Sequence, residues 1–153
     1  MRRIVRSLVV NFFLLALVAV SFGAKDESLE QLKAHFETAR PEDRADLGIR
    51  IGQLQLRNAD KLYVDGNVEQ AVADVNEVVS YSEKARDAAT ETNKHLKNVE
   101  IDVRKMAEKL RDIKRTLAFE DQPPVEQAIR RLEEVRTSLL KAMFAKENKA
   151  EKK

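Results

Sequence analysis

The chain has no cysteine and no tryptophan among its 153 residues. Without cysteine it can form no disulfide bond, and no lipid can be attached at a lipobox cysteine. Only two histidines, His35 and His95, occur, and neither has a glutamate three residues before it, the spacing that helical metal sites use. We therefore interpret both histidines as surface residues, and we predict no metal ligands and no cofactor.

Glycine and proline are also scarce, and neither occurs between residues 68 and 120. The sequence contains no glycine-rich phosphate loop, and no serine has the histidine and aspartate context of a catalytic nucleophile. Acidic pairs such as Glu133 and Glu134 are adjacent, so they point to different sides of a helix. These absences predict no catalytic or cofactor-binding residues and a protein that is not an enzyme.

Basic and acidic residues are nearly balanced, with 28 of the first and 26 of the second. Three of the basic residues are arginines in the first six positions, which leaves 25 basic residues against 26 acidic ones in the rest. No arginine cluster or aromatic platform is present, so we predict no nucleic-acid binding. The lysines at the C-terminal end leave open a weak association with an acidic membrane surface.

The N-terminal residues have the layout of a secretory signal peptide. Three arginines are followed by an apolar run from 8 to 20, interrupted only by Asn11, and then by the small residues Ser21 and Gly23. We predict a signal peptide over residues 1–23 and export to the periplasm or the cell exterior. The alternative is an uncleaved membrane anchor at residues 1–24, although the apolar run is shorter than the ~20 residues of a spanning helix.

The strongest pattern is a heptad register without a slip between residues 71 and 117. Its spacing alternates between four and three residues, as in a packed helical or coiled-coil seam. We predict one very long central helix over about 68–118, roughly 75 Å in length. The seam positions are Ala71, Val75, Val78, Ser82, Ala85, Ala89, Thr92, Leu96, Val99, Val103, Met106, Leu110, Ile113 and Leu117.

Shorter amphipathic segments predict three further helices, over about 28–40, 42–63 and 124–144, separated by proline and glycine signals. We expect the first two to pack on the first half of the long helix and the last to pack on its second half. The predicted fold is an all-α, elongated antiparallel bundle over residues 25–145. Residues 146–153 are charged and carry no apolar stripe, which predicts a disordered tail.

Residues 59–71 resemble the turn of a tetratricopeptide-like helical hairpin, because Ala59, Leu62, Gly66 and Ala71 stand at the offsets of that motif. The resemblance covers about 30 residues. It implies the hairpin geometry only, since no second copy of the motif follows. The whole chain also resembles small exported helical proteins of bacteria, a likeness that implies no site.

These observations predict an exported, non-catalytic helical scaffold or protein-interaction module, with no small-molecule substrate. The long helix would hold two packed ends apart, and a protein partner would bind near the small residues Ala85, Ala89 and Thr92 or along residues 93–98. A homodimer through the long helix is a second possibility. A membrane-tethered bundle and a helical-bundle ligand or metal carrier remain as alternatives. The partner, the pathway and the oligomeric state do not follow from the sequence.

Overall fold

The computed structural model describes residues 28–150, with side chains up to residue 145, and it is helical from end to end with no strand in that range. The elements are α1 (Leu29–Thr38), α2 (Pro41–Val64), α3 (Val68–Thr92), α4 (Leu96–Thr116), the 3-10 turn η1 (Phe119–Asp121) and α5 (Gln122–Ala150). The predicted all-α antiparallel bundle is confirmed. The predicted signal peptide at 1–23 lies outside the described residues.

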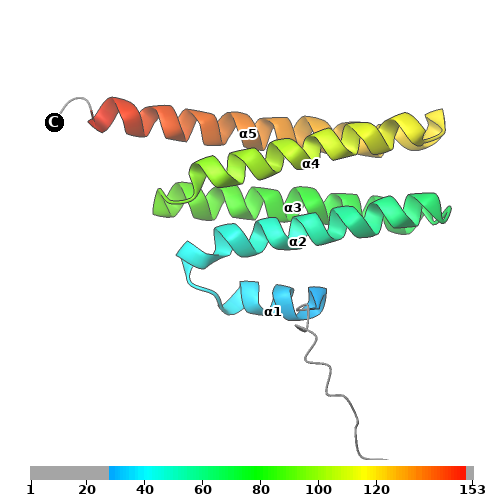
Figure 1. Ribbon diagram of the computed structural model, residues 1–153, viewed down its shortest axis with the longest axis horizontal. Helices are drawn as coiled ribbons and strands as arrows, with labels where there is room; N and C mark the ends of the chain where they lie inside the picture. The colour runs from blue at the N-terminus through cyan, green and yellow to red at the C-terminus, as the bar shows by residue number, and fades with distance from the viewer. Residues whose placement is uncertain (1–27, 151–153) are drawn as a thin grey trace, which may run out of the picture.

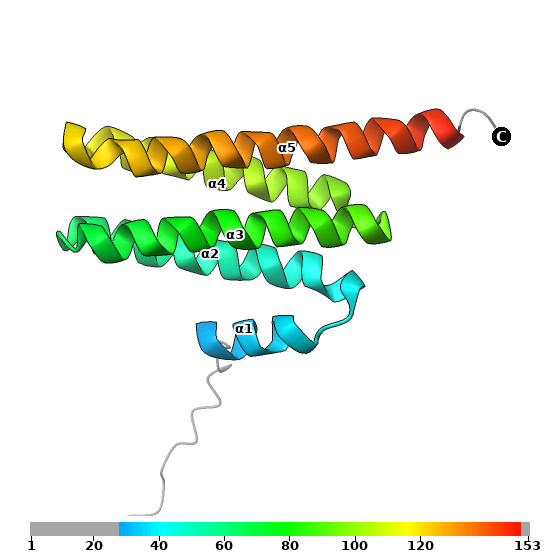
Figure 2. The same ribbon diagram turned by 180° about the vertical axis from the view of Figure 1, so that it is seen from behind.

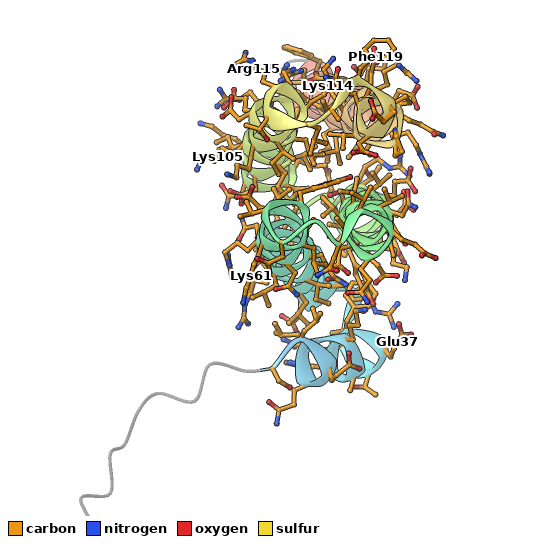
Figure 3. The ribbon with its side chains drawn as sticks, turned by 90° about the vertical axis from the view of Figure 1, so that its right-hand side faces the viewer. Glu37, Lys61, Lys105, Lys114, Arg115 and Phe119 are labelled. Atoms are coloured by element: carbon orange, nitrogen blue, oxygen red, sulfur yellow. The ribbon has the colours of Figure 1, made fainter. Side chains whose placement is uncertain are left out.

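Two antiparallel hairpins, α2–α3 and α4–α5, are stacked on each other, and α1 lies under the α2–α3 layer (Figure 1). The view from behind shows the same three layers (Figure 2). Seen end-on, α4 lies over α2 and α5 lies over α3 (Figure 3). The main hydrophobic core fills the space between the two hairpins, with buried side chains from α2, α3, α4 and α5.

The prediction of one very long helix over 68–118 is wrong. The chain leaves the helix after Thr92 and re-enters it at Leu96, so α4 runs back antiparallel to α3. Asn93 (φ 57°) and His95 (φ 61°) both adopt the left-handed conformation, which reverses the chain within three residues. This conformation costs ordinary residues about 1–2 kcal/mol each, and asparagine and histidine are among the residue types that adopt it more readily.

The residues of the predicted seam are nevertheless almost all buried. A heptad pattern indicates which side chains face a core, but it does not show whether one continuous helix carries them. Ala85 and Ala89 before the turn and Leu96 and Val99 after it are all in the core. Folding back lets the α4–α5 hairpin cover the apolar face of α2–α3, which a straight rod would leave in water. The predicted rod with two separated ends is therefore replaced by a compact stack of hairpins.

The other helix limits follow local signals in the sequence. Ser28 caps α1 in a capping box with Gln31, and Gly66 (φ 78°) makes the turn between α2 and α3. The two prolines at 123 and 124 stand in the first turn of α5, where a missing N–H group costs nothing. At the other end, α5 continues to Ala150, so residues 146–150 are helical where a disordered tail was expected.

Gly48 and Gly52 mark the places where α2 approaches its neighbours closely enough to leave little room for a side chain. A Cβ atom on Gly48 would lie 3.0 Å from the Tyr81 carbonyl oxygen and 3.1 Å from the Ala85 Cβ atom. A Cβ atom on Gly52 would lie 3.4 Å from the Met106 sulfur atom of α4. The absence of side chains at these two positions therefore brings α2 against α3 and makes room for Met106.

A second, smaller hydrophobic cluster holds α1 on the underside of α2–α3. The Phe36 ring meets the Tyr81 ring edge to face, with 5.4 Å between centroids. Lys33 Nζ pairs with Glu77 Oε2 of α3 at 2.8 Å, and this hydrogen bond raises the pKa of Lys33. A helix of ten residues has little stability alone, so α1 depends on this docking.

Candidate interaction surface

Of the two places predicted for a partner, the small residues Ala85, Ala89 and Thr92 do not form an open surface, whereas the ridge at 93–98 is exposed except at Leu96. Ala85 and Ala89 are fully buried, and Ala85 is covered by the backbone of α2 at Gly48. Thr92 is half-buried and donates its hydroxyl hydrogen bond to the Ala88 carbonyl oxygen at 2.8 Å. The predicted ridge at 93–98 is the α3–α4 turn and the first turn of α4. The small residues thus serve the packing of α2 on α3.

The α3–α4 turn is tied to the N-terminal part of α2 by an exposed ion pair and by an exposed contact between a histidine and a carboxylate. Lys94 Nζ donates to Glu42 Oε1 at 2.8 Å, and His95 Nδ1 lies 3.4 Å from Asp46 Oδ1. The hydrogen bond from Lys94 lowers the pKa of the Glu42 carboxyl group from its ordinary value of 4.5. The charged form of Glu42 is therefore favoured by the fold.

This pairing predicts a pH-dependent difference between the natural protein and Glu42→Gln. Because the folded pKa is lowered, the pairing stabilises the fold above pH 4.5, and this contribution is lost as the pH falls through the lowered pKa. We expect Glu42→Gln to be less stable than the natural protein at pH 7 and equal to it near pH 2. Urea unfolding at both pH values measures this, and a constant difference would contradict the pairing.

A shallow groove of about 190 Å³ opens between α2 and α4, where the two hairpins meet. Leu56 and Met106 form its floor, and both side chains are buried. Its remaining lining residues are polar or basic: Gln53, Arg57, Lys105 and Lys109. An apolar floor with cations around it is the arrangement expected for a segment that carries both apolar and acidic side chains.

Two of the basic side chains have an acidic neighbour on the rim of the groove. Lys109 Nζ lies 2.6 Å from Asp60 Oδ2, which links α4 to α2 along the rim. Lys105 Nζ is 3.8 Å from Asp102 Oδ1, one turn earlier on α4. Among the side chains of residues 28–145, no carboxylate lines the groove itself. Lys105 and Lys61 project from the same side of the bundle (Figure 3), so the basic side chains extend beyond the groove.

A second hollow of about 420 Å³ follows the surface of α5, and residues of that helix alone line it. Of its two acidic residues, Glu133 and Glu134, the first is engaged by Arg111 Nη2 at 2.6 Å and by Arg136 Nη1 at 3.5 Å. Arg136 also donates from Nε to Glu100 Oε1 at 2.6 Å, and Glu100 is only 8% exposed. These four side chains form an ion-pair ladder between α4 and α5.

His35 and His95 are both exposed, as predicted. Among residues 28–150, no three histidine or acidic side chains come together as metal ligands would. None of the helices in this range combines the length and apolar character that crossing a bilayer requires. No protein-family model, curated protein or solved structure matches the chain. The proposal for its function therefore depends on the groove and on the sequence.

Proposed function

We propose that this chain is an exported, non-catalytic interaction module that binds a protein partner through the groove between α2 and α4. The observation that carries the proposal is the meeting of an apolar floor, Leu56 and Met106, with three basic side chains. A partner segment with an apolar side chain between acidic ones would match both features. The basic rim would also speed the encounter with such a segment through long-range attraction.

The groove is built on side chains of the main hydrophobic core. Met106 is 2% exposed and packs in the core, against the space that Gly52 leaves free. Both walls are helices whose inner faces lie in the main core. A partner would therefore meet a preformed surface, which lowers the entropic cost of binding.

A charge reversal on the groove tests this proposal. We expect the double variant Arg57→Glu, Lys105→Glu to capture its partner at least tenfold less well than the natural protein, in quantitative pull-downs from the native cell envelope. The matched control, Arg130→Glu with Lys141→Glu, makes the same charge change on exposed residues of α5. Capture of the same proteins in the same amounts by all three forms would refute the groove as the binding site.

Export is the part of the proposal that rests on residues 1–23 alone. Their basic, apolar and small-residue regions support cleavage near Gly23. N-terminal sequencing of the protein recovered from cells tests this part separately. A protein that still begins at Met1 in a membrane fraction would favour the tethered bundle instead.

A further inference from the structure

The α3–α4 turn joins two helices whose apolar seams share one unbroken heptad register. Counting from Ala89 through Thr92 to Leu96 and Val99 gives the spacing of a single continuous helix. Only residues 93–95 leave the helix, and two of these three adopt a left-handed conformation without being glycine. The same residues can therefore be arranged in two ways, as a tight turn or as the middle of one long helix.

No residue near the turn prevents the helical arrangement. Neither glycine nor proline occurs from 68 to 120, and the side chains from Thr90 to Lys94 are polar, so they tolerate exposure in a straight helix. Straightening would remove the left-handed conformation of Asn93 and His95. Short hinge loops under such strain favour the exchange of structural elements between copies of a protein.

We propose that this chain forms a dimer with a second copy of itself by exchanging the α4–α5 hairpin, with α3 and α4 joined into one helix in each copy. The α4–α5 hairpin of one copy then packs on the α2–α3 hairpin of the other. Every core contact between the hairpins is formed again, since the same residues meet in the same geometry. The two states therefore differ mainly at the turn and in the cost of association.

Two of the contacts that hold the closed turn are weak ones. The pairs Lys94–Glu42 and His95–Asp46 lie at the surface, where ion pairs contribute little to stability. Two favourable terms offset the loss of these pairs. Asn93 and His95 leave the costly left-handed conformation, and the straightened segment gains helical hydrogen bonds. The balance then depends on protein concentration, with the closed monomer favoured when the protein is dilute.

The end of the bundle that carries the turn also offers an apolar contact for the second copy. The C-terminal turns of α5 extend past the α3–α4 turn (Figures 1 and 2). Phe144, in the C-terminal third of α5, is 60% exposed. In the exchanged dimer the second bundle lies beyond this same end, because both long helices leave the first bundle there. We therefore expect the partner copy to cover Phe144.

Substitutions at the two left-handed residues test the proposal, with the full chain as cells process it. Asn93→Ala with His95→Ala favours helix and penalises the turn, whereas Asn93→Gly with His95→Gly favours the turn. By light scattering over a concentration series, we expect the alanine pair to raise the monomer–dimer association constant at least tenfold and the glycine pair to lower it. The single variant His95→Ala should raise the association constant by a smaller factor. If the alanine pair does not fold, this single variant is compared with the glycine pair instead.

Cross-linking separates exchange from side-by-side association. Arg131 of α5 pairs with Glu83 of α3 at 2.5 Å, and the chain has no other cysteine to interfere. In Glu83→Cys, Arg131→Cys, a short bis-maleimide should link the chain to itself in the monomer fraction and link two chains in the dimer fraction. A dimer fraction that runs as single chains on a denaturing gel would refute the exchange, as would an alanine pair that stays folded and monomeric at every concentration.

Discussion

Leu110→Ala is expected to lower the free energy of unfolding by about 2–5 kcal/mol, because it leaves a cavity in the main core. Leu110 is fully buried, and its position on α4 places it in the cluster that the two hairpins share. A loss there weakens the contact between the hairpins as well as the packing of α4. Urea unfolding followed by circular dichroism measures the change.

Glu108→Ala is the matched control for this substitution, since Glu108 is an exposed residue of the same helix. Its 3.7 Å ion pair with Arg104 is at the surface, so its removal should change stability by no more than about 0.5 kcal/mol. Equal losses for the two variants would contradict the packed interface between the hairpins.

Gly48→Leu is expected to destabilise the fold by about 3 kcal/mol, through overpacking and not through a cavity. The first added carbon atom already meets the Tyr81 carbonyl oxygen at 3.0 Å, and this backbone atom cannot turn away as a side chain could. To admit leucine, α2 must move away from α3 along much of its length. The midpoint of thermal unfolding reports the loss.

Gly52→Ala provides the comparison for Gly48→Leu, one turn further along α2. Its nearest new contact is the flexible side chain of Met106 at 3.4 Å, an ordinary separation. Alanine is favoured over glycine in a helix by about 1 kcal/mol, so this variant should match or exceed the natural stability. If Gly52→Ala lowers the stability as much as Gly48→Leu does, then the space around Gly52 is as restricted as the space around Gly48, which would contradict this account.

Much of the fold could be predicted from the sequence, because apolar periodicity and helix-ending signals act locally. The seam residues are almost all buried as predicted, and the Gly66 turn and the capping box at Ser28 follow from local sequence signals of the same kind. The break at Asn93 was missed because the heptad count runs through it. The signal that could have revealed it is an asparagine in a polar stretch, a residue type that ends helices in the left-handed conformation.

The groove could not be predicted, because its walls become neighbours only when the chain reverses at residues 93–95. Within one long helix, Met106 and Lys105 lie far from Arg57 of α2, and Met106 reads as core filler. Met106 and Leu56 come together at the floor of the groove only because α4 stacks on α2. One missed turn therefore hides the groove, although both of its walls are segments that the sequence predicts to be helical.

The ion-pair ladder between α4 and α5 determines whether the stack of hairpins can grow. Arg131 of α5 faces Glu83 of α3, so the ladder of Glu100, Arg111, Glu133 and Arg136 lies on the side of α5 away from α3. Glu100 is already buried, but a third hairpin added on that side would strip water from the three partly exposed members, Arg111, Glu133 and Arg136, without supplying new partners for them. The molecule is thus terminated at this layer, in the way that end repeats of a solenoid present a polar outer surface and stop further addition.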